Sequence, residues 1–92
     1  MRTVKLMNIF IPSPLRSYTQ NKSKVEGTGG TMSELLEDLD RKFPGIRFRM
    51  VDEQDQIRTH IKIFVNREQA TTLATVLQAK DEVLIICALS GG

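Results

Sequence analysis

The sequence of 92 residues contains one cysteine, one histidine and no tryptophan. Cys87 alone cannot form a disulfide within the chain, and no Cys/His cluster has the spacing of a zinc site. His60 has no serine or cysteine nucleophile beside it in the sequence, so nothing indicates a catalytic triad. We therefore expect no metal site. Cys87 is expected to be a small buried hydrophobic residue, and His60 a solvent-facing strand residue.

Long apolar runs are also missing. No stretch approaches the ~18 apolar residues of a membrane-spanning helix, and Met1 to Leu6 do not resemble a signal peptide, so we expect a cytoplasmic protein without a membrane partner. The 13 Lys and Arg residues are interleaved with 11 Asp and Glu. Only Arg47-Phe48-Arg49 and Lys22-Ser23-Lys24 approach the basic and aromatic clustering of nucleic-acid binders. A solvated surface explains both more simply, and we expect no nucleic-acid partner.

The chain length suits one domain, and its pattern predicts the order β-β-α-β-β. Residues 3–11 form a first strand that ends at Pro12, and residues 21–27 form a polar second strand, paired with the first at an edge of the sheet. Residues 60–66 form a third strand that turns after Asn66. Residues 46–58 are interpreted as a long connection with some local structure, and residues 73–77 as a helical turn or a crossing strand.

A helix is predicted to begin at Thr31. Thr31 and Glu34 have capping-box spacing, in which Thr31 accepts from the Glu34 N–H and Glu34 accepts from the Thr31 N–H. The helix ends at Pro44-Gly45. The preceding segment, Gly27 to Gly30, lacks the pattern of a phosphate-binding loop and is predicted to be a turn. The core is predicted to contain Leu35, Leu36, Leu39, Ile61, Ile63, Val65, Val83 and Ile85.

The last strand, within residues 81–90, is apolar on both faces. Such a strand is normally central and covered on both sides, yet a single helix covers only one face of a sheet. The second face is then either an exposed apolar patch that binds partners or is covered by residues 46–58. The candidate partner-binding residues are Phe64, Leu84, Ile86, Ala88, Leu89 and Ser90.

The sequence ends in Gly91-Gly92, directly after this strand. Because glycine has no Cβ, two glycines can thread a channel too narrow for a side chain and bring a terminal carboxylate to a partner enzyme. We therefore take Gly91 and Gly92 as the candidate reactive residues, on a flexible tail of residues 91–92 that follows a domain of residues 1–90. A chance pair of glycines or a truncated chain would give the same ending. The assignment of a reactive terminus therefore also depends on whether the rest of the chain forms a suitable carrier domain.

Several short motifs occur together in a defined order: Ile11-Pro12 with Leu15-Arg16 and Thr19, Thr31 opening a helix that runs through Leu39 to Pro44-Gly45-Ile46, Phe64-Val65-Asn66, and Asp81-x-Val83 leading to Gly91-Gly92. In this arrangement nearly the whole chain resembles the ubiquitin-like β-grasp sulfur carriers, such as the small subunit of molybdopterin synthase and the thiamine-pathway carrier. It resembles most closely the carriers that feed sulfide to a cysteine synthase. It departs from them at Cys87, where they tend to have proline.

The resemblance implies an α+β fold, the ubiquitin-like β-grasp, with a mixed four- to five-stranded sheet packed on one main helix. It also implies a protein substrate with no bound cofactor, and not an enzyme. An ATP-dependent adenylyltransferase of the ubiquitin-activating type would adenylate the Gly92 carboxylate, and a sulfur donor would convert it to a thiocarboxylate. The recipient would be a cysteine synthase or the large subunit of a molybdopterin synthase, for which this chain would be a non-catalytic small subunit.

Two other classes of function remain open at this point. The activated Gly92 could form an isopeptide bond with a lysine, as in a ubiquitin-like protein modifier. Alternatively, the domain could bind partners through its sheet while its glycine end stays inert.

Overall fold

The computed structural model describes residues 6–88. Residues 1–5 and 89–92 lie outside this part, so the predictions for Leu89, Ser90, Gly91 and Gly92 and for the domain and tail boundary stay predictions. Within residues 6–88 no helix is long and apolar enough to span a membrane. The elements are β1 (Leu6–Phe10), the 3-10 helix η1 (Ser13–Leu15), β2 (Lys24–Thr28), α1 (Met32–Lys42), α2 (Ile46–Met50), β3 (Ile61–Val65), β4 (Glu68–Ala70) and β5 (Glu82–Cys87).

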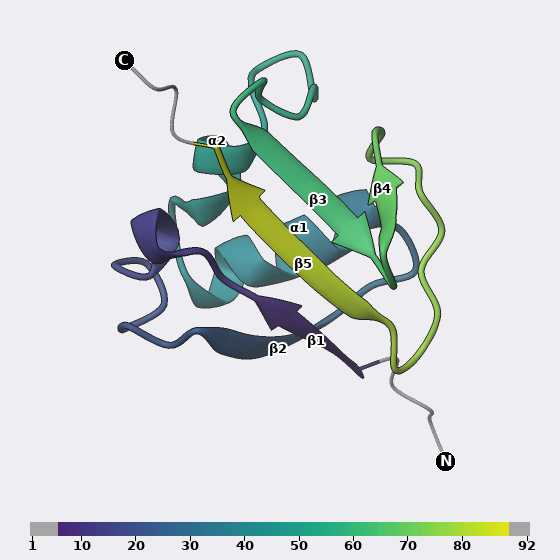
Figure 1. Ribbon diagram of the computed structural model, residues 1–92, viewed down its shortest axis with the longest axis horizontal. Helices are drawn as coiled ribbons and strands as arrows, with labels where there is room; N and C mark the ends of the chain where they lie inside the picture. Colours follow the sequence, from purple (N-terminus) through teal and green to yellow (C-terminus); the bar gives the residue numbers. More distant parts are fainter. Residues whose placement is uncertain (1–5, 89–92) are drawn as a thin grey trace.

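The five strands form one mixed sheet in the order β2-β1-β5-β3-β4. The central strand, β5, runs parallel to β1 and antiparallel to β3. The β1–β2 and β3–β4 pairs are antiparallel, and β2 lies at an edge. Figure 1 shows α1 crossing one face of the sheet, with β5 over it. The α+β fold, the central position of the last strand and the edge position of the second strand are confirmed.

The N-terminus of α1 is fixed by side chains and by a tight glycine turn. The Glu34 N–H donates to Thr31 Oγ1 at 3.3 Å, as the capping box predicts. The Glu34 carboxylate, however, accepts from the Gly30 N–H at 2.7 Å and not from that of Thr31, because the preceding turn brings Gly30 closer. A Cβ on Gly29 would lie 2.6 Å from the Leu35 backbone nitrogen, so the turn can pack here only with glycine.

The core lies between α1 and the covered face of the sheet. Leu35, Leu36 and Leu39 are fully buried, which confirms the predicted apolar face of the helix. From the sheet, Ile63 and Ile85 are also buried. Of the eight predicted core residues only Val65 is half-buried, and the buried cluster further includes Met7, Ile9, Ile11, Leu15, Val25, Met32, Ile46, Met50, Val51, Ala70 and Leu77.

The buried carboxylate of Asp38 joins α1 to β2. It accepts from the Thr28 N–H at 3.1 Å and pairs with Arg41 and Lys42, each at 3.0 Å. Burial acts to raise the pKa of Asp38, but the hydrogen bonds from Arg41, Lys42 and the Thr28 N–H outweigh that effect and hold the pKa below its usual value.

The order β-β-α-β-β was incomplete, since it lacked α2 and β4. Residues 46–50 form a helix that buries Ile46 and Met50, and the turn at Asn66-Arg67 leads into the short strand β4. Leu73 and Ala74 lie in a turn in which the Thr75 N–H donates to the Thr72 carbonyl at 3.4 Å, and the segment then meets α1, where the Met32 N–H donates to the Thr75 carbonyl at 2.9 Å. A single bridge pairs Val76 with Thr31, so the segment is neither a helix nor a strand: it combines a turn with one isolated β-bridge.

Candidate functional site

The second face of β5 is exposed. Leu84 and Ile86 remain 44% and 39% exposed, while the alternate residues Val83 and Ile85 are buried against α1. The alternative in which residues 46–58 cover this face is therefore wrong, because the buried residues of α2 are part of the same core cluster as α1. The predicted exposed apolar patch is present.

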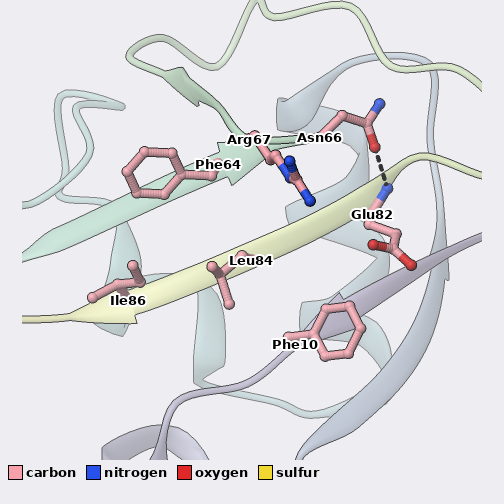
Figure 2. A pocket seen from close by; sticks show the side chains of 7 residues that line it. All are labelled: Phe10, Phe64, Asn66, Arg67, Glu82, Leu84 and Ile86. Carbon is pink, nitrogen blue, oxygen red and sulfur yellow. Dashed lines mark hydrogen bonds between the residues drawn. The ribbon is translucent and has the colours of Figure 1, made fainter.

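Two aromatic residues complete the patch from the neighbouring strands. Leu84 pairs with Phe10 of β1 on one side and with Phe64 of β3 on the other, so the three residues lie abreast across the sheet. Together with Ile86 they line a shallow depression of about 600 Å³, and all four side chains lie on the same side of the sheet in Figure 2. We call Phe10, Phe64, Leu84 and Ile86 the apolar face.

Polar residues line one end of the depression: Asn66, Arg67 and Glu82. The Asn66 carboxamide accepts from the Glu82 N–H at 2.9 Å, the contact dashed in Figure 2. Arg67 sits in the turn at a φ of 79°, a left-handed conformation that favours glycine. Its guanidinium makes no ion pair with another described residue. Among residues 6–88, therefore, Arg67 is a cation without an ion pair at this end of the depression, which the Glu82 side chain also lines.

A second hollow of about 410 Å³ adjoins Phe10 and Leu84 on the β1–β2 side. Arg16 and Lys24 line it, and the Arg16 Nε donates to the Ile11 carbonyl at 3.0 Å. The apolar face thus has basic groups near both of its ends, an arrangement in which apolar contact supplies affinity and the charged rim supplies orientation.

The structure brings three predicted partner-binding residues together: Phe64, Leu84 and Ile86. Ala88 is exposed just beyond β5 but does not line the depression. Phe10 was missed. Its signal was present, because Phe10 alternates with buried Ile9, but only the parallel register with β5 places it beside Leu84.

The other singled-out residues have no role in this depression. Cys87 is half-buried and packs against the core, so it is less enclosed than predicted. His60 is exposed, as predicted, but precedes β3 by one residue. Among residues 6–88 no three His, Cys, Asp or Glu side chains are grouped in a way that could hold a metal ion.

The mixed sheet, its single long helix and the exposed apolar face define a ubiquitin-like β-grasp protein. Residues 9–92 match the model of the ThiS family. The chain is 31% identical to the sulfur carrier protein CysO of Mycobacterium tuberculosis over 91 residues, which cover 94% of this chain and 98% of that protein. The chain belongs to the ThiS family: it is a sulfur carrier that resembles CysO, and like other members it is a non-catalytic carrier and not an enzyme.

Solved structures agree with this assignment. The crystal structure of M. tuberculosis CysO superposes with a TM-score of 0.85 at 28% identity, covering 90% of this chain and 99% of that one. A chain in the Amycolatopsis orientalis BexX/CysO complex gives 0.86 at 29% identity, with 94% and 99% covered. The small archaeal modifier protein SAMP1 of Haloferax volcanii, at 23% identity and 0.78 with 95% and 99% covered, shares the fold.

Proposed function

We propose that this chain carries sulfur as a thiocarboxylate on Gly92. Membership of the ThiS family, with the match extending through residue 92, is the observation that carries the proposal. The apolar face supplies a docking surface on the same strand that leads toward Gly92, so one partner can hold the domain and reach the terminus.

The chemistry needs two displacements at one carbon. The Gly92 carboxylate attacks the α-phosphate of ATP, forming an acyl-adenylate and releasing pyrophosphate. A sulfide donor then attacks the acyl carbon, so that a C–S bond forms as the C–O bond to AMP breaks. Adenylation is required because a carboxylate is a poor electrophile until its oxygen becomes part of a good leaving group.

The proposed partners are an adenylyltransferase of the ubiquitin-activating type, which binds and uses ATP as its co-substrate, and a sulfur-accepting enzyme. The similarity to CysO supports a recipient of the cysteine-synthase type, with a molybdopterin-synthase large subunit as the next choice. The proposal places this exchange in the cytoplasm.

Intact-mass measurement tests the proposal after incubation of the chain ending at Gly92 with ATP, sulfide and the activating enzyme. Replacement of one oxygen by sulfur is expected. Conjugates of higher mass would instead indicate a protein modifier, and an unchanged mass would indicate an inert glycine end.

Variants of the terminus locate the reacting atom. Deleting Gly92, appending one alanine, or replacing Gly91 with leucine displaces or blocks the carboxyl carbon, and a shift of even ~1 Å can cost about a hundredfold in rate. Each change should abolish ATP–pyrophosphate exchange while circular dichroism stays unchanged. Full exchange by the variant that lacks Gly92 would contradict the proposal.

A further inference from the structure

A second surface lies at the end of the sheet where β5 finishes. Phe48 and Arg49 of α2, with Arg58 and His60 of the following loop, line a small hollow of about 190 Å³. We call these four residues the arginine cluster. Phe48 is 58% exposed, more than either aliphatic residue of the apolar face. The exposed Phe48 ring is in contact with one of these cations, Arg58.

The two guanidinium groups of the cluster are held in place by aromatic neighbours. The Arg58 guanidinium lies 4.6 Å from the centroid of the Phe48 ring, and its Nε donates to the Phe48 carbonyl at 2.8 Å. The Arg49 guanidinium lies 5.8 Å from the centroid of the Tyr18 ring, and its Nε donates to the Tyr18 hydroxyl at 2.7 Å. Within residues 6–88 their Nη groups make no hydrogen bond or ion pair, so these donors are oriented and available.

Nearby carboxylates are engaged elsewhere. Asp55 pairs with Arg47 at 3.1 Å. Asp40 accepts the Gly45 and Arg47 N–H groups at the start of α2, and Asp52 accepts two backbone N–H groups of its own loop. Among the described residues, therefore, no carboxylate forms an ion pair with Arg49 or Arg58.

The arginine cluster lies close to the end of β5. The Ala88 N–H donates to the His60 carbonyl at 2.7 Å, and Ile61 pairs with Cys87. Figure 1 shows the arrow of β5 ending beside α2. A protein that contacts the chain at Ala88 therefore comes close to His60 and the arginine cluster.

We propose that the arginine cluster binds Asp and Glu carboxylates of the activating enzyme, at the mouth of the channel that receives Gly91-Gly92. This inference rests on the proposed function. Planar guanidinium groups with free Nη donors match carboxylates in two-point geometry. A nucleic acid fits less well, because Arg58 already lies over the Phe48 ring on which a base would stack.

The test measures ATP–pyrophosphate exchange by the activating enzyme as a function of carrier concentration, between low and physiological salt. The variants are Arg49→Glu and Arg58→Glu. Lys80→Glu is the control, since it makes the same charge change in the turn before β5, at the opposite end of that strand. Arg58→Lys keeps the charge and loses the planar group. Circular dichroism and urea unfolding check that each variant folds.

We expect each Glu variant to raise the KM for the carrier about three- to tenfold at low salt, with kcat little changed. The salt dependence of KM should weaken in the same variants, Arg58→Lys should restore most of the salt dependence, and Lys80→Glu should behave as wild type. A purely structural role would not change the salt dependence.

Three results would overturn the inference. Wild-type exchange accompanied by unchanged KM and salt dependence in both Glu variants would remove the arginine cluster from the interface while leaving the proposed function intact. Tight binding of a fluorescent RNA or DNA oligonucleotide, lost in the Glu variants, would assign the cluster to nucleic acid. No exchange by the wild-type chain would instead contradict the proposed function, and the inference with it.

Discussion

The side chains of Asn66 and Asp81 are hydrogen-bonded at 2.8 Å, which joins the β3–β4 turn to the start of β5. The Asn66 carboxamide oxygen accepts from the Glu82 N–H at 2.9 Å, and the second Asp81 oxygen accepts from the Gln78 N–H at 2.7 Å. Each side chain thus uses both of its polar ends. The pair fixes the position at which the central strand enters the sheet, and therefore where Leu84 and Ile86 fall on the apolar face.

Asn66→Ala and Asp81→Ala should each lower the free energy of unfolding by about 1–3 kcal/mol, because each leaves a polar partner unsatisfied. The double variant should lose less than the sum of the two, since the shared hydrogen bond is removed only once. Urea unfolding measures all three. Gln54→Ala, at an exposed loop position, is the control with little expected change. Strict additivity would show that the two side chains act independently.

The pKa of Asp38 predicts how stability depends on pH. Because this pKa is lower in the folded chain than in the unfolded one, the carboxylate contributes stability above about pH 4, and that contribution is lost as the pH falls through the folded value. Asp38→Asn should lose about 1–2 kcal/mol near neutral pH. The difference from wild type should shrink as the pH falls below about 4.

Urea unfolding between acidic and neutral pH measures this effect, and Glu37→Gln, an exposed neighbour on α1, is the control. If the free energy of unfolding falls with decreasing pH as steeply in Asp38→Asn as in wild type, the loss of stability in acid comes from other carboxylates.

The elements that the sequence predicted best are those with local signals. The capping pair Thr31 and Glu34 fixed the start of α1, and the two-sided apolar pattern predicted a central β5. By contrast, α2 is five residues long, and the residue before it, its N-cap Gly45, has a φ of 97°. β4 has three residues, Glu68–Ala70, of which two are polar and exposed. Elements this short have no hydrophobic period, and tertiary contacts decide them.

The difference between local signals and tertiary contacts also applies to the apolar face and the arginine cluster. Alternation in β5 predicted that Leu84 and Ile86 share a face, but the neighbours of a strand depend on register. Phe10 was missed for that reason. The arginine cluster also depends on tertiary contacts, since Tyr18 and Arg49 are 31 positions apart in the sequence. The segment Arg47-Phe48-Arg49, interpreted as a solvated surface, gains its significance only from the position of α2 beside the end of β5.

Docking through the apolar face predicts a large effect of Phe64→Asp. A charged group placed in the depression should weaken binding to the activating enzyme by at least about 2 kcal/mol, roughly thirtyfold in Kd, as for a central aromatic anchor. Titration calorimetry with the enzyme measures it. Leu84→Ser is a second variant, since Leu84 is more exposed than Phe64 and perturbs the fold less.

Val76→Asp is the matched control, because Val76 is an exposed apolar residue, 67% accessible, that does not line the depression. Equal loss of affinity in Phe64→Asp and Val76→Asp would indicate a general effect of charge and would remove the apolar face from the interface.

Substitutions of Arg67 should separate an effect on stability from an effect on binding to the activating enzyme. Its φ of 79° is a conformation that an L-residue adopts at a cost of about 1–2 kcal/mol, which glycine avoids while losing about 0.5–1 kcal/mol in chain entropy. Arg67→Gly also completes an Asn-Gly pair, which two-residue hairpin turns favour. We therefore expect this variant to be more stable by about 0.5–1 kcal/mol in urea unfolding. The Arg67 side chain lines the depression, so the Arg67→Gly variant should also bind the activating enzyme more weakly.

Arg67→Ala separates the two effects, because it removes the guanidinium but keeps the Cβ. This variant should lose as much affinity for the enzyme as Arg67→Gly, without the gain in stability. Unchanged affinity in both variants would show that the unpaired cation at the end of the apolar face does not contact the enzyme.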